Sequence, residues 1–116
     1  MFELGKFRLD PASGVLTYDS RPTALGLRAV AVLTALVERS EEFVSKANLL
    51  EAAWPNTVVE EGNLPVQIAA IRRVLATDGG EHWIETLPRR GYHFVGPVKK
   101  LTNDQPVPAG VQRQAA

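Results

Sequence analysis

The chain has 116 residues, of which 45% are hydrophobic, and its 13 Lys+Arg balance 13 Asp+Glu to a formal net charge of zero at pH 7. This length accommodates one domain with a short tail, and the absence of cysteine excludes disulfides, thiolate zinc sites and cysteine nucleophiles. No apolar run approaches the roughly 18 residues of a membrane span and the N-terminus lacks a signal-peptide pattern, so we expect a cytoplasmic protein.

Positive charge is gathered in the later half of the chain. Residues 1–61 carry six Lys+Arg against nine Asp+Glu, whereas residues 62–100 carry six against three. Electrostatic attraction falls off within a Debye length of about 8–10 Å, so a distant acidic face subtracts little from a local basic patch. A net charge of zero therefore does not exclude a nucleic-acid partner.

The first 25 residues read as short strands separated by turn signals. Brief alternating or apolar runs occur at residues 2–4, 7–9 and 15–18, and a fourth strand is expected near 23–25. The spacing predicts a small antiparallel meander. Because two or three strands alone are marginal in water, one face of this meander must pack on a helix.

Two helices are predicted next. Apolar residues spaced i, i+3, i+4 and i+7 predict a helix over residues 28–39, followed by a short extended link at 41–44. Ser45 has the chemistry of an N-cap, since its hydroxyl can accept a hydrogen bond from a free backbone N–H in the next turn. The second helix then covers residues 46–54 and is stopped by Pro55.

Residues 63–75 carry the clearest helical pattern of the chain. The residues that recur at steps of four, three and four, and so form one apolar stripe, are Leu64, Ile68, Ile71 and Leu75. Those on the opposite side and its flanks are Asn63, Val66, Gln67, Ala70, Arg72 and Arg73. No acidic residue lies between Gly62 and Thr77, which suits docking against a polyanion, although an ordinary amphipathic helix with a small-residue face has the same pattern.

Pro65 limits where this third helix begins. Proline has no N–H and clashes with the preceding turn, so it is tolerated only where N–H groups have no intrahelical partner. The helix should therefore start between Glu61 and Leu64, with Asn63 as a candidate cap. Roughly 13 residues at 1.5 Å each give a rod of about 20 Å, which can lie in a DNA major groove.

A hairpin with a basic tip follows. Strand-like runs at residues 82–87 and 92–95 are joined by Pro88-Arg89-Arg90-Gly91, in which glycine is expected to supply the positive φ of a tight turn. The composition after Val98 is that of a linker or a frayed terminus. We therefore expect a folded domain over residues 1–98 and a tail over 99–116.

The order of strands, helix, helix, loop, helix and hairpin is the plan of a winged helix-turn-helix. Three runs carry a family resemblance: V-S-K-A-N-L-L-E-A-A-W-P-N from residue 44, V-V-E-E-G-N-L-P-V-Q-I-A-A-I-R-R-V-L from residue 58, and I-E-T-L-P-R-R-G-Y-H-F from residue 84. They resemble the OmpR/PhoB-type winged-helix domain of bacterial transcription regulators, over about residues 2–98. With no receiver before it, the chain looks more like the CadC/ToxR-like or ATPase-linked members.

The resemblance implies an α+β fold: a winged helix-turn-helix with an N-terminal four-stranded antiparallel sheet, three helices and a C-terminal β-hairpin wing. Family members commonly place basic residues at positions matching Gly62, Ala69 and Ala70, and this chain has none there. Direct base readout by arginine, worth about 1–3 kcal/mol per good pair, is thus not available at those positions. The candidates for base contact are two apolar side chains suited to thymine methyls, Val66 and Ala70, and two amides suited to adenine edges, Asn63 and Gln67.

Phosphate contacts are assigned to five residues. Arg72 and Arg73 suit phosphates, which position a protein without specifying sequence; a solvated helix flank is the alternative. Thr86 resembles a phosphate-binding threonine of the family, or else simply fills a strand. Arg89 and Arg90 stand at the wing tip, one place beyond the usual wing arginine, where charge can also serve solubility alone.

Four further residues complete the candidate site. Tyr92 is expected to pack under the wing with its hydroxyl towards phosphate, and Trp54 either donates its indole N–H to a phosphate or belongs to the core. Glu60 and Glu61 look like the loop through which relatives contact RNA polymerase, with a plain solvated acidic loop as the alternative.

Catalysis is not expected. The two histidines, His82 and His93, have no cysteine or helix-spaced carboxylate partner, so neither a metal site nor a catalytic triad is indicated. Residues 78–81 form a helix-ending turn rather than a Gly-rich phosphate cradle, and no cofactor is expected.

The sequence thus predicts sequence-specific binding of double-stranded DNA by a bacterial transcription regulator. The helix at 63–75 would lie in the major groove and the wing at 86–92 on the backbone or minor groove, with pairing of copies on direct repeats as in relatives. The alternative is a winged-helix protein-interaction module that docks a partner through the loop at 55–62 or the small-residue face.

Overall fold

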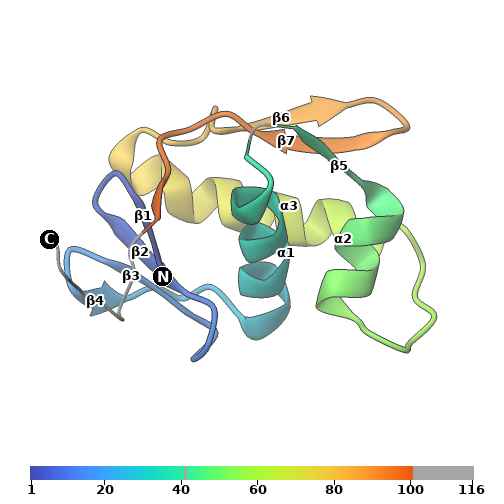
Figure 1. The fold of residues 1–116 in the computed structure, drawn as a ribbon, viewed down its shortest axis with the longest axis horizontal. Coiled ribbons are helices and arrows are strands. Elements are labelled where there is room, and N and C mark those ends of the chain that lie inside the picture. The colour runs from blue at the N-terminus through green and yellow to red at the C-terminus, as the bar shows by residue number, and fades with distance from the viewer. Residues whose placement is uncertain (41, 101–116) are drawn as a thin grey trace, which may run out of the picture.

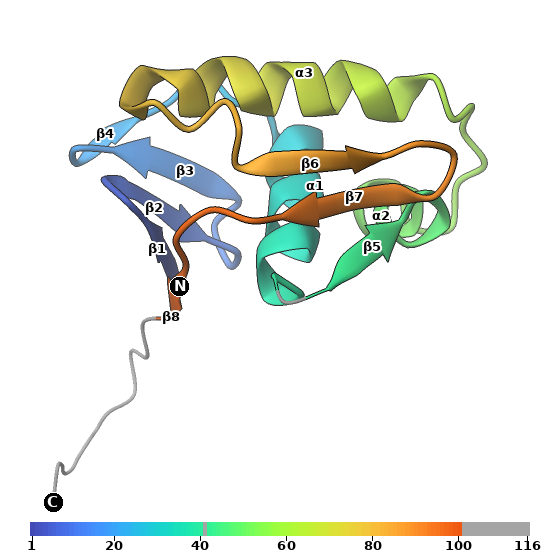
Figure 2. The ribbon, with the colours of Figure 1, turned by 90° about the horizontal axis from the view of Figure 1, so that it is seen from above.

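The computed structural model describes residues 1–40 and 42–100. In them, two antiparallel sheets, with strand orders β4-β3-β2-β1-β8 and β5-β7-β6, pack around three helices (Figures 1 and 2). No helix in these ranges is long and apolar enough to cross a membrane. The predicted α+β winged-helix architecture is therefore present.

The N-terminal sheet contains the four predicted strands. These are β1 (Phe2–Leu4), β2 (Phe7–Asp10), β3 (Val15–Tyr18) and β4 (Arg21–Pro22). The last strand begins two residues earlier than the predicted 23–25, because Asp19 and Ser20 both adopt positive φ, 51° and 70°, and turn the chain at once. Tyr18 therefore pairs directly with Arg21.

A fifth strand closes this sheet. Lys99–Lys100 forms β8 and pairs antiparallel with β1, opposite Glu3 and Phe2. These two residues were assigned to the tail, so the sheet extends two residues past the predicted boundary at Val98. The remainder of the predicted tail, residues 101–116, lies outside the described residues.

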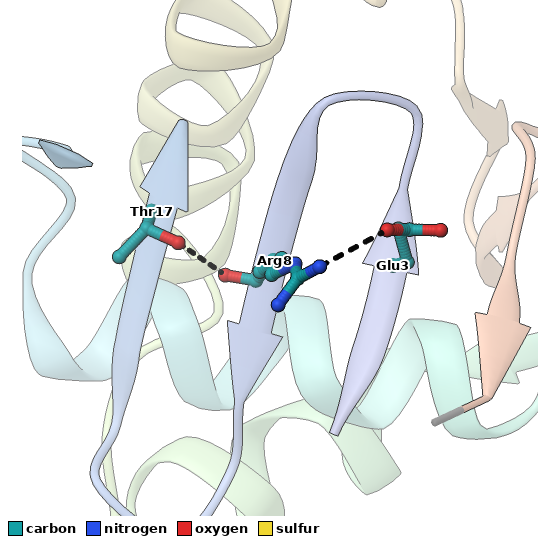
Figure 3. Close-up of polar contacts among 3 residues, drawn as sticks. All are labelled: Glu3, Arg8 and Thr17. Carbon is teal, nitrogen blue, oxygen red and sulfur yellow. Dashed lines mark hydrogen bonds and ion pairs between the residues drawn. The ribbon is translucent and has the colours of Figure 1, made fainter. Parts of the chain in front are cut away.

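The two faces of the N-terminal sheet differ in chemistry. One face is buried and consists of Phe2, Leu4, Phe7, Leu9 and Leu16. The other is polar (Figure 3): Arg8 lies 3.7 Å from the Glu3 carboxylate, and the Thr17 hydroxyl donates to the Arg8 carbonyl over 3.4 Å. This strict alternation sets the register, since a slip of one residue would expose the apolar set.

Helix α1 (Leu27–Glu38) is the centre of the core, and it is shifted by one residue from the predicted 28–39. Its buried side chains are Ala29, Val30, Val32, Leu33, Leu36 and Val37. They contact α2 and α3 as well as strands of both sheets. The apolar residues of α1 thus hold the two sheets in one body.

Helices α2 and α3 follow the sequence pattern closely. Ser45 caps α2 (Lys46–Ala53) by accepting from the Asn48 N–H at 3.1 Å, as predicted, while Trp54 is the C-cap rather than the last helical residue. Helix α3 (Asn63–Leu75) buries the predicted stripe of leucines and isoleucines. Its N-cap is Gly62; Asn63 is the first helical residue instead of the cap.

The second sheet contains the hairpin and one unexpected strand. Strands β6 (Ile84–Leu87) and β7 (Gly91–Phe94) form the predicted hairpin, although β6 begins later than residue 82. Phe43–Ser45 was predicted to lie in or next to an extended link, and it forms β5, which pairs with β7. An isolated hairpin is marginal in water, so this third strand supports the wing.

Candidate nucleic-acid interface

Helix α3 and the hairpin β6–β7 lie side by side. In both views, the hairpin tip points towards the end of α3 at which this helix begins (Figures 1 and 2). The side chains of α3 that point to solvent include Asn63, Val66, Ala69 and Arg73, whereas Gln67 and Ala70 are half-buried. All candidate base-contact residues are thus on or beside the solvent face of this helix.

Arg72 joins the two elements. Its Nη2 donates to the Ile84 carbonyl and to the Thr86 hydroxyl, both at 2.8 Å. Two residues assigned separately to phosphates are therefore partners of each other. Since the Thr86 oxygen accepts from a guanidinium, its own O–H remains free to donate outward, and the donated bond polarises it.

The tip of the hairpin is a tight turn with an arginine in an uncommon conformation. The Arg90 N–H donates to the Leu87 carbonyl at 3.0 Å, Pro88 occupies the second position and Arg89 has a φ of +64°, the pattern of a type II turn. The expectation that Gly91 supplies the positive φ was wrong, because the turn closes one residue earlier. Both arginine side chains at the tip are exposed.

Gly91 is needed for a different reason. A Cβ at this position would lie 2.0 Å from the Val44 carbonyl oxygen, because β5 and β7 approach closely there. The Lys46 N–H also donates to the Arg90 carbonyl at 3.1 Å. The tip of the wing is therefore anchored on the start of α2.

One candidate residue lies in the core, and a second is half-buried against it. Tyr92 is 6% exposed and packs under the wing as expected, between Val44 and Thr86 in the sheet. Trp54 is half-buried, and the Arg28 guanidinium lies 5.8 Å from its ring centroid while donating to the Ala53 carbonyl. Arg28 thus closes the C-terminal end of α2, and no local signal in the sequence indicated this role.

The acidic loop before α3 is exposed and partly neutralised. Glu60 and Glu61 both point to solvent, and Glu61 lies 3.5 Å from the Lys46 ammonium. The Glu60 carbonyl accepts from the Asn63 side-chain amide at 3.2 Å. One amide that was assigned to bases is therefore held by the loop.

The excess positive charge of residues 62–100 divides between two places. Four arginines lie on α3 and the hairpin: Arg72, Arg73, Arg89 and Arg90. Lys99 and Lys100 belong instead to β8, at the edge of the N-terminal sheet away from α3 (Figure 2). Within the described residues, no group of three or more His, Cys, Asp or Glu is placed to hold a metal ion.

A family model described as "Transcriptional regulatory protein, C terminal" matches residues 20–94. The chain belongs to this family. The match covers α1, α2, α3 and the whole hairpin, and it confirms the OmpR/PhoB-type resemblance. The N-terminal strands before residue 20 lie outside the match.

Two curated transcription regulators match this chain over only part of their own length. HilA of Salmonella typhimurium is 36% identical over 95 residues, which cover 82% of this chain and 17% of HilA. PhoB of Pseudomonas aeruginosa is 30% identical over 93 residues, or 79% of this chain and 40% of PhoB. The chain thus spans less than half of the length of these relatives.

Solved structures agree on the fold of this family member. The DNA-binding domain of Escherichia coli CadC superposes with a TM-score of 0.70 at 25% identity, over 84% of this chain and 94% of that one. The RstA DNA-binding domain of Klebsiella pneumoniae, solved in complex with the RstA box, gives 0.61 at 22% identity, over 79% and 93%. The winged-helix architecture is thus shared although the sequence identity is only 22–25%.

Proposed function

We propose that the chain binds double-stranded DNA sequence-specifically, as the DNA-binding part of a bacterial transcription regulator. Helix α3 enters the major groove, and the β6–β7 hairpin lies on the adjacent backbone or minor groove. The observation that carries this proposal is the Arg72 bridge, because it fixes a groove-sized helix and a basic hairpin as one surface. A helix of 13 residues without a carboxylate meets no electrostatic penalty against phosphates.

The surface divides into residues that position and residues that specify. Arg73, Arg89 and Arg90 are exposed and supply phosphate contacts, together with the free O–H of Thr86. Such contacts set register and orientation but carry no sequence information. Sequence is then read by the solvent face of α3, and Tyr92 contributes at most its hydroxyl, since its ring is in the core.

Contacts beyond DNA follow from the same placement. We assign the exposed loop with Glu60 and Glu61 to RNA polymerase, because it flanks the start of α3 and presents both carboxylates to solvent. Pairing of two copies on direct repeats would place the two loops in the same orientation along the duplex. We place this DNA-binding part in the cytoplasm, where the bacterial chromosome lies.

The test begins with selection from a random duplex pool, followed by a salt titration on the recovered sequence. With four to six phosphate contacts, log K should fall with log[salt] at a slope of roughly −4 to −5. Arg89→Ala should weaken all duplexes alike and reduce the slope by about one. Gln67→Ala should instead relax preference at one position.

Lys99→Ala is the matched control, because it removes an exposed cation from the other sheet. It should leave both the affinity and the salt slope unchanged. Absence of binding to any duplex, or a flat salt dependence, would favour the alternative of a protein-interaction module. In that case capture of a protein partner would depend on the loop at 55–62 or the small-residue face of α3.

A further inference from the structure

The middle of the solvent face of α3 is apolar. Val66 is 64% exposed, Ala69 is exposed one turn further on, and Ala70 is half-buried beside it. The first cationic residues of the helix, Arg72 and Arg73, come only in its last turn. A large apolar side chain in this position is exposed to water unless a partner covers it.

The polar groups near this patch limit what it can read. Recognition of guanine in the major groove is typically made by the fork of an arginine or by a lysine, and residues 63–71 hold neither. The Asn63 amide is engaged with the Glu60 carbonyl at 3.2 Å, which restricts its orientation. Gln67 is left as the amide beside the patch.

We propose that this chain selects sites by the 5-methyl groups of thymine, with Val66 as the principal contact and Ala69 and Ala70 beside it. This inference rests on the proposed function. The thymine methyl is the one apolar group that a base pair presents in the major groove, so it matches an apolar helix face that has no arginine fork. The preferred DNA is therefore a duplex with thymines at fixed positions under the centre of α3.

The decisive probe is deoxyuridine, which lacks the 5-methyl group but keeps every hydrogen-bonding group of thymine. Each thymine of the duplex recovered by selection is replaced in turn. Replacement should lower affinity about three- to tenfold at one or two thymines, in line with the loss of one buried methyl. Thymines outside the footprint of α3 should show no change.

Val66→Ala then identifies the protein partner of those methyl groups. In this variant, the thymine and deoxyuridine duplexes should bind about equally at the sensitive position. Alanine is a better helix former than valine and the position is exposed, so the variant should fold, which circular dichroism checks. Val15→Ala deletes the same two methyl groups from β3 in the N-terminal sheet and should keep the full sensitivity to deoxyuridine.

The outcomes separate this inference from the function on which it rests. Duplex binding with the expected salt slope but without a response to deoxyuridine at any thymine overturns thymine recognition and leaves DNA binding standing. A response that persists unchanged in Val66→Ala overturns the assignment to this face of α3. Absence of binding to every duplex overturns both proposals.

Discussion

The two sheets of this protein are both small, antiparallel and packed on α1. They differ in whether their arginines form ion pairs and in which residues adopt positive φ in their turns. In the N-terminal sheet, Arg8 pairs with Glu3 at 3.7 Å on the polar face (Figure 3). In the described residues, none of the arginines of α3 and the hairpin makes an ion pair; the second pair is Lys46 with Glu61. Arg8 in the N-terminal sheet thus has a carboxylate partner, whereas the arginines of α3 and the hairpin in the described residues are left unpaired where phosphates would be met.

The turns show the same contrast. At the β3–β4 turn, positive φ falls on Asp19 and Ser20, whose small polar side chains suit tight turns. At the wing tip it falls on Arg89, a long side chain that adopts this region at a cost of about 1 kcal/mol. A residue held in a less favourable conformation at an exposed basic tip is what a functional constraint predicts.

The largest effect is expected from Gly91→Ala. The new Cβ would lie 2.0 Å from the Val44 carbonyl oxygen, a backbone atom that cannot rotate away, so β5 and β7 must separate. We expect a loss of about 3 kcal/mol in the free energy of unfolding, at the upper end of overpacking effects, measured by urea denaturation. Gly62→Ala is the control, because a Cβ added at this position would meet nothing within 4 Å and the φ of −61° suits alanine. Its effect on the free energy of unfolding should be neutral or slightly stabilising. Equal stability of the two variants would contradict the close approach.

Arg72→Ala should come next. It removes both hydrogen bonds to β6 and should cost about 1–2 kcal/mol of stability, given that the side chain is half-buried. Because the hairpin loses its link to α3, DNA affinity should fall by more than one phosphate contact explains. Arg73→Ala is the neighbouring control: stability should change by less than about 0.5 kcal/mol, and the salt slope should fall by about one. If the two variants behave alike, Arg72 is only a phosphate contact.

The features predicted correctly depend on residues close together in the sequence, whereas the features missed depend on contacts between distant segments. The buried stripe of α3 and the Ser45 cap follow from spacing and chemistry within one or two turns, and both are confirmed. The pairing of β5 with β7 and of β8 with β1 joins segments far apart in the chain, so no local pattern reports it.

The candidate site shows the same limit. Spacing placed Asn63, Val66 and Arg73 on the solvent face, where they lie, but it included Ala70, which is half-buried, and left out Ala69, which is exposed. It also treated Arg72 and Thr86 as independent contacts. Their hydrogen bond depends on how a helix and a strand pack, which local periodicity does not contain. The turn at the wing tip was misassigned because glycine is the usual source of positive φ. Here Gly91 is explained instead by the close approach of the Val44 carbonyl oxygen, which leaves no room for a Cβ.

Arg89→Gly tests the contrast between the turns, because it should raise the stability of the fold and lower its DNA affinity. Glycine adopts a φ of +64° readily, so stability should rise by about 0.5–1 kcal/mol once its greater unfolded-state entropy is counted. DNA affinity should fall, because an exposed cation is lost from the wing tip. Ser20→Gly, at a φ of +70° in the N-terminal sheet, should bring a similar or smaller stability change and leave DNA affinity untouched. A drop in DNA affinity for both would argue against a specific role of the wing.

The smallest effect is expected from removing the carboxylate of each ion pair, which should change DNA affinity for the Lys46–Glu61 pair and leave it unchanged for the Arg8–Glu3 pair. Glu61 lies 3.5 Å from Lys46, and the Lys46 N–H is bonded to the carbonyl of Arg90 at the wing tip. Glu61→Gln should therefore leave an unpaired cation beside the DNA surface and strengthen duplex binding about two- to fivefold at low salt, an advantage that high salt should remove. Glu3→Gln breaks the equivalent pair on the N-terminal sheet and should change stability by less than about 0.5 kcal/mol and DNA affinity not at all. Titrations of both variants at two salt concentrations decide the point: if Glu61→Gln is silent, Lys46 is too far from phosphate to contribute, and the DNA surface ends at the hairpin.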